Sequence, residues 1–443
     1  MDLASIFKAY DIRGTYPDQI DEVAVYGIGA AFAVFADAQT VVVGRDMRLS
    51  SPAIARAFIE GVNSQGVDVV DIGQVSTDAL YFASGRYAIP GAMITASHNP
   101  GNYNGIKPCR ASAAPIGQDT GLLEIKALAE SGLSPAARVG TTAEREILPE
   151  FIDHLLSFID ADALRPLKVV VDAANGMAGK IVPMAFERLP VELVPLYFEL
   201  DGTFPNHPAD PIQIENLRDL RDKVISEKAD LGLAFDGDAD RVFLVDEKAE
   251  PVSGSLTTAL VASRALMKEK GASVVHNLIC SRVVSETVRE FGGTPIRTRV
   301  GHSFIKQVMA ETNSIFGGEH SGHYYFRDNF RADSGLICAM FVLEALSVQS
   351  KGMSEVLQPF QRYWNSGEIN TPVPDQDAKL KELAGAFADG SSDWTDGLTV
   401  DYEDWWFNVR GSNTEPLLRL NVEARDPDYG AQMTAKLVDL ISK

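Results

Sequence analysis

The sequence predicts an α/β protein of four domains, in which three α/β domains of similar design are followed by a small α+β domain. The chain has 443 residues, about three times the usual size of one domain. Short β-branched segments alternate with longer helical patterns over roughly the first 350 residues, which favours βαβ units with largely parallel sheets. The order of elements then changes, so the last part of the chain is assigned to a separate domain.

The first domain, residues 1–143, is expected to contain two helices and three strands. The apolar run from Val23 to Ala36 is shorter than the roughly 18 residues that cross a bilayer, so it predicts a buried helix. Another helix is expected to begin near Ser50, its N-cap, with Pro52 in the first turn. The strands are predicted at Thr40–Gly44, Val67–Gly73 and Gly91–Ala96.

The alternation restarts at Leu167–Asp172 and at Ser273–Cys280, which places the second domain at residues 144–249 and the third at 250–366. The other elements expected there are strands at Val191–Phe198, Ala229–Phe235 and Thr294–Val300 and helices at Ile214–Ser226 and Ser281–Phe291.

The fourth domain, residues 367–443, begins with the polar stretch Gly367–Asp377, which contains two prolines and is expected to be a linker. The elements predicted after it are a helix at Ala378–Ala388, strands at Leu398–Tyr402, Trp405–Val409 and Leu417–Ala424, and a terminal helix.

Charge and cysteine content exclude several classes of function. The chain has 61 acidic and 40 basic residues, a formal net charge of −21, which disfavours nucleic acid and anionic membranes as partners. Small anionic substrates need a local concentration of basic residues. Three scattered cysteines, Cys109, Cys280 and Cys338, do not suit a disulfide framework or a zinc site and indicate a reducing compartment. The N-terminus lacks a secretory signal pattern, so we expect a cytoplasmic protein.

The first candidate site loop is TASHNPG, residues 95–101, at the carboxyl end of a predicted strand, where open α/β sheets usually bind ligands. Asn-Pro-Gly favours a turn that presents the hydroxyl of Ser97, a weak nucleophile unless a base or a positive field assists it. His98 is adjacent, but neighbouring side chains in an extended segment point in opposite directions, so no Ser97–His98 pair is predicted. On this segment alone, a turn with a solvent-facing serine is an equal alternative.

The second loop places Asp236, Asp238 and Asp240 at alternate positions between two strand-like segments. Three such carboxylates repel one another unless a hard cation neutralises them. An EF-hand is the rival, with Glu247 at its twelfth position, but Arg241 stands where that loop requires glycine and the flanks are strands. The loop therefore predicts a short Mg²⁺ site rather than a solvated acidic hairpin.

The third and fourth loops are weaker signals. The third loop is GGEHSGH, residues 317–323. Its glycines allow the backbone to come close to a ligand, and its Glu, Ser and His side chains can bind hydroxyl groups, as a sugar site requires. Zinc is disfavoured there because no third ligand stands at a helical spacing from the two histidines. RGSNTEP, residues 410–416, offers an arginine, hydroxyls and backbone amides to a phosphate, with an ordinary hairpin turn as the alternative.

Together, the four loops describe phosphoryl transfer to and from a phosphosugar, and they resemble one family. TASHNP, DGDADR, GGEHSGH and RGSNTEP, in this order, are similar to the loops of the α-D-phosphohexomutases, the bacterial phosphomannomutase/phosphoglucomutase family. The resemblance covers the whole chain and includes YDIRG at 10–14, NGIK at 104–107 and GTFPNH at 202–207.

The resemblance implies three related α/β domains with mixed sheets and a flexible α+β domain, each supplying one loop to a central cleft. It implies that hexose 6-phosphate and hexose 1-phosphate are interconverted through a hexose 1,6-bisphosphate, with one Mg²⁺ per chain and the bisphosphate as activator. Ser97 would carry the phosphoryl group, with Arg13, Lys107 and Arg241 as cations nearby. The remaining roles implied are metal binding by Asp236, Asp238 and Asp240 with a Ser97 phosphate oxygen, sugar binding by Glu319 and Ser321, and phosphate binding by Arg410, Ser412, Asn413 and Thr414.

A proton acceptor for the sugar hydroxyl is predicted separately, because an imidazole titrates near neutral pH. His302, at a strand-to-helix turn after Gly301, is the first candidate, although a capping or packing histidine is an equal alternative. His323 is the second candidate and is also assigned to substrate binding, and His98 is assigned to the catalytic group beside Ser97.

Three positions depart from the family pattern. Ala239 stands where glycine is commoner, His320 where several relatives carry methionine, and Ile279 where some relatives place a lysine facing the substrate. Whether Arg282 compensates for that lysine is left open.

A mutase is favoured over a phosphatase that uses the same serine and metal, over a phosphoglucosamine mutase and over a non-catalytic sugar-phosphate binding protein. The KAYDIRG opening and the third loop favour the mannose/glucose branch of the family, and we expect mannose phosphate as the preferred substrate, with glucose phosphate possible. The oligomeric state and any protein partner are not predicted by the sequence.

Overall fold

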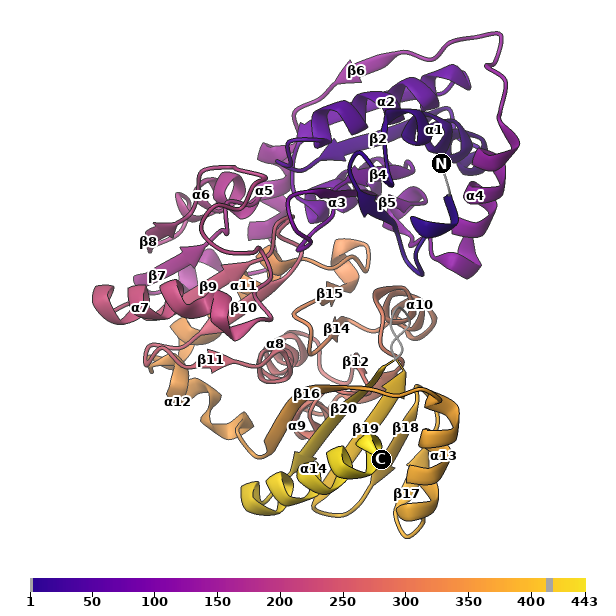
Figure 1. Ribbon diagram of the computed structural model, residues 1–443. Helices are drawn as coiled ribbons and strands as arrows, with labels where there is room; N and C mark the ends of the chain where they lie inside the picture. Colours follow the sequence, from indigo (N-terminus) through magenta and orange to yellow (C-terminus); the bar gives the residue numbers. More distant parts are fainter. Residues whose placement is uncertain (1–2, 412–416) are drawn as a thin grey trace.

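The computed structural model describes residues 3–411 and 417–443, and its strands form four separate sheets (Figure 1). Each sheet and the helices that cover it form one domain. In Figure 1 the first domain lies at the top and the fourth at the bottom, with the second and third between them.

The first sheet has the strand order β1-β5-β4-β2-β3-β6, in which β5 is antiparallel to both of its neighbours and the other pairs are parallel. α1, α2 and α4 cover one face of this sheet and α3 covers the other. The element bounds are β1 Ile12–Thr15, α1 Glu22–Ala36, β2 Thr40–Arg45, α2 Ser51–Ser64, β3 Asp68–Gln74, α3 Thr77–Tyr87, β4 Gly91–Ile94, β5 Tyr103–Cys109, α4 Leu122–Ser131 and β6 Thr142–Glu144.

The second sheet has the order β11-β10-β9-β7-β8, with parallel pairs on either side of β7 and antiparallel pairs at β10. Its domain contains α5 Leu148–Leu156, β7 Leu167–Asp172, α6 Ala178–Phe186, β8 Val191–Leu196, α7 Arg218–Glu227, β9 Leu231–Phe235, β10 Val242–Val245 and β11 Pro251–Val252.

The third sheet has the order β13-β12-β14-β15, and only the β14–β15 pair is antiparallel. Its domain contains α8 Gly254–Lys268, β12 Ser273–Asn277, α9 Arg282–Glu290, β13 Thr294–Thr298, α10 His302–Thr312, β14 Phe316–Gly318, β15 Tyr324–Phe326, α11 Gly335–Gln349 and α12 Met353–Leu357.

The fourth sheet has the order β16-β20-β19-β18-β17 and is antiparallel throughout. Its domain contains β16 Trp364–Pro372, α13 Gln376–Ala386, β17 Ser391–Asp393, β18 Leu398–Asp401, β19 Trp405–Gly411, β20 Leu417–Ala424 and α14 Pro427–Ser442.

The first three sheets share one design, a group of parallel strands extended by an antiparallel strand, and this confirms the predicted fold class of three mixed-sheet α/β domains and a C-terminal α+β domain. The expectation of largely parallel sheets was wrong at β5, β10 and β15, which reverse direction. The loops β4–β5, β9–β10 and β14–β15 thereby become connections between antiparallel neighbours, and they are the first three of the four candidate site loops.

Two local expectations need correction. The stretch expected to be a linker, Gly367–Asp377, begins inside β16, whose backbone pairs with β20, so its first part belongs to the fourth sheet. Ser50 is the N-cap of α2, but its side chain makes no cap hydrogen bond and instead accepts one from Asn104 at 2.8 Å. The exact domain boundaries stay predictions, and β6 and β16 straddle two of them.

The core of the molecule is divided unequally. One continuous cluster of buried apolar side chains joins the first three domains, running from Met93 through Val171 to Leu336. The fourth domain has a cluster of its own, which includes Leu398, Phe407 and Leu437. Three domains therefore pack as one body, and the fourth is a separate unit.

Among the described residues, no single helix has the length and apolar character needed to cross a membrane. α11 followed by Met353–Phe360, bent by 97°, meets that test only as a pair.

Candidate active site

The serine loop follows β4, and its backbone takes an unusual conformation at the serine itself. Ser97 has a φ of 50°, in the left-handed region that residues other than glycine seldom adopt. The Ser97 hydroxyl donates to Asp236 Oδ2 at 2.6 Å and lies 3.3 Å from His98 Nδ1. The expectation that these neighbours point apart was therefore wrong, because it assumed an extended backbone.

The three aspartates of the metal loop lie together between β9 and β10. Asp236, Asp238 and Asp240 are buried, and each offers an oxygen atom within 4.8 Å of the others. Asp238 Oδ1 and Asp240 Oδ1 accept no hydrogen bond although both atoms are buried. Two buried carboxylate oxygens without hydrogen donors, beside a third carboxylate, fit a hard divalent cation. The residue between them, Ala239, has a φ of 62°, which accounts for the commoner glycine at this position.

Two cations neutralise part of this charge. Lys107 Nζ donates to Asp238 Oδ2 at 2.8 Å and to Asp240 Oδ2 at 2.6 Å, and Arg241 Nε donates to Asp236 Oδ2 at 3.0 Å. Burial raises the pKa of Asp236 to about 7, against the opposing effect of Arg241 and with the help of the neighbouring carboxylates. Burial would also raise the pKa of Asp238, but Lys107 outweighs it, so that pKa is lowered.

His98 is surrounded by positive charge. Burial, followed by the charges of Arg241, Arg13 and Lys107, lowers the pKa of His98 well below its ordinary value. The imidazole is consequently neutral at neutral pH and can share a proton with the Ser97 hydroxyl. Arg13 reaches the same loop by donating to Asn99 Oδ1 at 2.5 Å and pairing with Asp11.

The third loop contributes Glu319, Ser321 and His323 from the β14–β15 connection. Glu319 is buried, and both of its carboxylate oxygens already accept hydrogen bonds, from Tyr325 OH at 2.8 Å and from Asn277 Nδ2 at 3.1 Å. His320 Nδ1 lies 3.2 Å from Asn277 Nδ2, and burial lowers the pKa of its imidazole to about 3.

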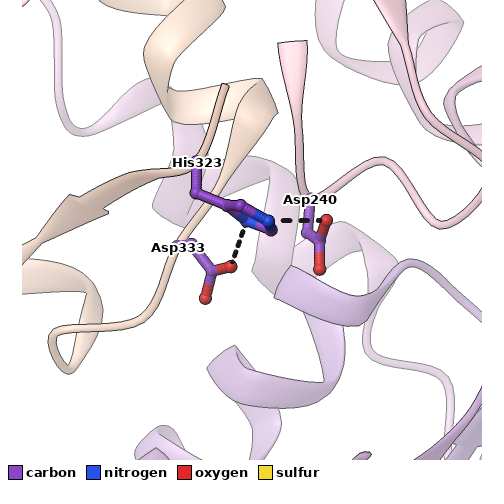
Figure 2. A group of neighbouring side chains, drawn as sticks. All are labelled: Asp240, His323 and Asp333. Carbon is purple, nitrogen blue, oxygen red and sulfur yellow. Dashed lines mark hydrogen bonds and ion pairs between the residues drawn. The ribbon is translucent and has the colours of Figure 1, made fainter. Parts of the chain in front are cut away.

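Figure 2 shows His323 pointing toward carboxylates on two other segments. His323 Nδ1 lies 2.9 Å from Asp333 Oδ2 and 3.9 Å from Asp240 Oδ1. Burial would lower the pKa of this imidazole, but Asp333 and Asp240 outweigh burial and raise it. Asp333 also pairs with the buried Lys306 at 2.9 Å, so His323 belongs to a chain of alternating charges that ends at the metal loop.

Part of the predicted site lies outside the described residues. Ser412, Asn413 and Thr414 of the fourth loop fall there, and the structure describes no side chain for His302, whose backbone begins α10. Arg410 lies at the end of β19 and donates to Glu368 Oε2 at 2.9 Å.

One cavity of about 1010 Å³ gathers residues of all four domains. The predicted site residues along its wall are Arg13, Ser97, His98, Lys107, Asp240, Ser321, His323 and Arg410. Segments that are far apart in the sequence thus face one cleft.

Several residues at the site were missed by sequence reasoning. Thr77, at the start of α3, donates its hydroxyl to Asp238 Oδ2 at 2.5 Å and its backbone amide to the Asp238 carbonyl at 3.1 Å. Arg48 and Asp46 lie behind the serine loop, and Lys306 and Asp333 lie behind His323. For the four charged residues, only their charge next to segments already singled out could have suggested them.

Arg282 does not replace the substrate-facing lysine that some relatives carry. Its guanidinium donates to the carbonyls of Tyr402 at 2.5 Å and Glu403 at 2.9 Å and pairs with Asp401 at 2.6 Å, so it holds α9 against the fourth domain. Ile279 is buried.

Comparison with protein families finds a match for each of the four domains. Four models match the chain, described as phosphoglucomutase/phosphomannomutase alpha/beta/alpha domains I, II and III and C-terminal domain, over residues 4–135, 149–250, 253–363 and 368–440.

Individual relatives cover nearly the full length. The chain is 40% identical to a phosphomannomutase of Salmonella montevideo, over 96% of each protein, and 42% identical to a protein of Xanthomonas campestris pv. campestris described as phosphohexose mutases, over 95% of each. Its fold superposes on that of a phosphoglucomutase/phosphomannomutase family protein from Burkholderia thailandensis with a TM-score of 0.91 and 34% identity, over 99% of this chain and 97% of that one.

Proposed function

The chain belongs to the phosphoglucomutase/phosphomannomutase family, and from this premise we propose that its cleft interconverts hexose 6-phosphate and hexose 1-phosphate, with mannose phosphate as the preferred substrate. The enzyme is an isomerase, since its substrate and product differ only in the position of the phosphoryl group. The contact that carries the proposal is the 2.6 Å hydrogen bond between Ser97 Oγ and Asp236, inside a buried cluster of three carboxylates that faces a four-domain cavity.

Ser97 is the residue that carries the phosphoryl group. In the phosphorylated enzyme, a sugar hydroxyl attacks the phosphorus of phosphoserine, the P–Oγ bond breaks, and Ser97 Oγ is released as it regains a proton. The product of this half-reaction is a hexose 1,6-bisphosphate. The second half-reaction returns the other phosphoryl group to Ser97 Oγ and releases the isomeric monophosphate. His98, whose pKa is lowered, is neutral and hydrogen-bonds the free hydroxyl between transfers.

Asp236, Asp238 and Asp240 would hold one Mg²⁺. When bound, this cation supplies charge stabilisation to the oxygens of the transferring phosphoryl group. Lys107, Arg13 and Arg241 supply further positive charge from the protein, and Lys107 lies within 2.8 Å of both Asp238 and Asp240. These local cations explain how a protein with a net charge of −21 binds an anionic substrate.

His323 is the better candidate for the group that removes the proton from the attacking sugar hydroxyl. Its ring lies along the cavity, and Asp333 fixes the orientation of the ring through Nδ1. His302, the first candidate from the sequence, remains the alternative. Asparagine at the true base should lower kcat by about 10²-fold or more, and asparagine at the other histidine should not.

The sugar and its second phosphate are assigned to the remaining loops. Ser321 is available for a hydroxyl of the sugar, whereas Glu319 acts mainly by holding Tyr325 and Asn277 in place. Arg410, with Ser412, Asn413 and Thr414, would bind the phosphate that is not transferred. Hexose 1,6-bisphosphate is the expected activator, because it restores phosphoserine when an intermediate escapes. The three cysteines are buried and free, which agrees with a reducing compartment such as the cytoplasm.

A coupled assay of both sugars tests this proposal. Purified enzyme with Mg²⁺ and a trace of bisphosphate is given mannose 1-phosphate or glucose 1-phosphate, and the 6-phosphate product and inorganic phosphate are both measured. We expect 6-phosphate from both sugars, a larger kcat/KM for mannose, and little free phosphate. Stoichiometric phosphate release without isomerisation would instead identify a phosphatase.

A further inference from the structure

A buried arginine behind the serine loop has no part in the chemistry described above. Arg48 follows β2 and is 1% exposed. Its guanidinium donates to the backbone carbonyls of Ser97 at 2.8 Å, Asn99 at 2.6 Å, Pro100 at 2.7 Å and Tyr103 at 3.0 Å. Its Nε pairs with Asp46 at 3.2 Å. One side chain therefore binds the carbonyls on both sides of the turn.

The serine loop needs such a partner for two reasons. Its left-handed residue, Ser97, adopts a conformation that costs free energy and persists only where the surroundings enforce it. The carbonyls of a tight turn are also unavailable to the sheet and must find other donors when buried. A planar guanidinium binds several carbonyls in one fixed geometry, which a lysine cannot do.

A phenylalanine from the second domain covers this arginine. Phe204, between β8 and α7, lies with its ring centroid 5.1 Å from the Arg48 guanidinium carbon. Its own φ is 52°, so its backbone is also left-handed. The outer edge of the ring reaches the metal loop, since a Cβ on Gly237 would lie 3.5 Å from Phe204 Cζ.

The serine loop and the metal loop touch at the same place. A Cβ on Gly237 would lie only 2.5 Å from the Ser97 carbonyl oxygen. Arg48 donates to that same carbonyl, and Phe204 lies against both Arg48 and the metal loop. The distance between Ser97 Oγ and Asp236 therefore depends on how these three segments pack.

We propose that Arg48 and Phe204 are positioning residues for phosphoryl transfer, which hold the Ser97 turn against the metal loop so that Ser97 Oγ stays aligned with the aspartates. This inference rests on the proposed function, because the positioning matters only if Ser97 takes part in phosphoryl transfer. Arg48 and Phe204 themselves touch neither the sugar nor the phosphoryl group. Sugar binding by the third and fourth domains does not depend on them.

The test uses Phe204→Leu and Arg48→Lys, with Phe186→Leu as the matched control. Phe186 is a buried phenylalanine of the same domain, in α6, and belongs to the apolar core. We expect each positioning variant to lower kcat roughly tenfold or more, because small misplacements of reacting groups are costly, and to leave KM for the hexose phosphate within about twofold. Phe186→Leu should lower the melting temperature and leave kcat unchanged.

A second measurement separates positioning from general destabilisation. Dephosphorylated protein is incubated with hexose 1,6-bisphosphate, and the rate at which Ser97 gains a phosphoryl group is followed by intact mass. Both variants should be slower than the parent by a factor similar to that in kcat. The double variant should lose little more than the more damaged single variant, because both residues act on one loop.

Three results would overturn the inference. Unchanged kcat and phosphorylation rate in Phe204→Leu would do so, as would a rise in KM with kcat preserved, or an equal loss of kcat in Phe186→Leu. Because Phe204→Leu keeps an apolar side chain, it remains informative if Arg48→Lys does not fold. A parent protein that gains no phosphoryl group would contradict the proposed function itself, and is thereby distinguished from a failure of the positioning variants.

Discussion

Ser97 and His98 lie side by side because the backbone at Ser97 is left-handed, and a neutral imidazole next to a hydroxyl is what a phosphoryl acceptor needs between transfers. The charged groups around these two residues have different effects. Lys107 and Arg241 pair with the aspartates, while burial raises the pKa of Asp236 to about 7. At this scale the site is a cluster of opposite charges from which a small displacement of one side chain would remove several contacts.

Replacing the nucleophile gives the simplest prediction at this scale. Ser97→Ala should lower mutase activity by about 10³-fold or more, because no other hydroxyl is bonded to Asp236 Oδ2 among the described residues. Intact-mass analysis after incubation with hexose 1,6-bisphosphate should find one added phosphoryl group in the parent and none in the variant. Ser131→Ala, at an exposed position in α4, serves as the control and should behave like the parent.

His207 gives a prediction for the dependence of stability on pH. Burial would lower the pKa of His207, but its hydrogen bond to Asp172 at 2.8 Å outweighs burial and raises it. A raised pKa in the folded state stabilises the protein fully below the unfolded value of about 6.5, and this stabilisation disappears as the pH rises through the folded value.

The measurement is urea unfolding of the parent and of His207→Gln at pH 6 and pH 9. The free energy of unfolding of the parent should exceed that of the variant by about 1.5 kcal/mol at pH 6, the usual size of a charge-assisted hydrogen bond. At pH 9 the difference should be much smaller. The same difference at both pH values would mean that protonated His207 does not stabilise the fold.

At the scale of elements, the important feature is that the loops β4–β5, β9–β10 and β14–β15 each lie between a strand and its antiparallel neighbour. A connection of this kind is short and leaves little freedom. Gly237 shows the consequence, since its Cα packs so closely on the serine loop that a Cβ would lie 2.5 Å from the Ser97 carbonyl oxygen.

Gly237→Ala should therefore lower activity by about 10²-fold, because the serine and metal loops must move apart to admit one methyl group. Gly27→Ala is the matched control, since α1 has open space at that position and alanine favours a helix by up to about 1 kcal/mol. Steady-state kinetics and melting temperatures of both variants check the prediction. Full activity in Gly237→Ala would show that the two loops are not in tight contact.

The sequence predicted most of the parallel strands, because runs such as Leu167–Asp172 are apolar and β-branched, as buried strands require. It did not predict β5, whose residues include a glycine, a lysine and a proline, and pairing with β4 and β1 is what makes this segment a strand. The three aspartates and Ser97 were identifiable because their motifs are local. Arg48, Thr77 and Asp333 were not, since their contacts join segments that only the folded chain brings together.

At the scale of the whole molecule, the cleft is built from one large body and one small one. The first three domains share an apolar core, whereas the fourth has its own core and contacts the third through polar pairs such as Arg282–Asp401. In the proposed reaction, Ser97 must serve both ends of the sugar, so the bisphosphate would have to turn over between transfers. A small domain that holds one phosphate and can move as a unit suits that task.

Arg410→Ala tests this view. It should raise KM about tenfold and also let the bisphosphate escape, since the proposed contact of Arg410 with the phosphate that is not transferred would be lost. The labelled intermediate is formed on the enzyme, an excess of unlabelled bisphosphate is added, and the label that reaches product is counted. If the variant retains as much label as the parent while KM rises, the loop binds the substrate without holding the intermediate.

The separate core of the fourth domain also has a calorimetric consequence. Cooperative unfolding extends only as far as apolar contacts are shared, so a polar boundary between two cores divides one heat-absorption peak into two. Differential scanning calorimetry of the intact chain should resolve a smaller transition for the fourth domain, whose core contains Phe407 and Leu437, and a larger transition for the other three domains. Arg282→Met, which removes the pair with Asp401, should lower the temperature of the smaller transition and leave the larger one in place.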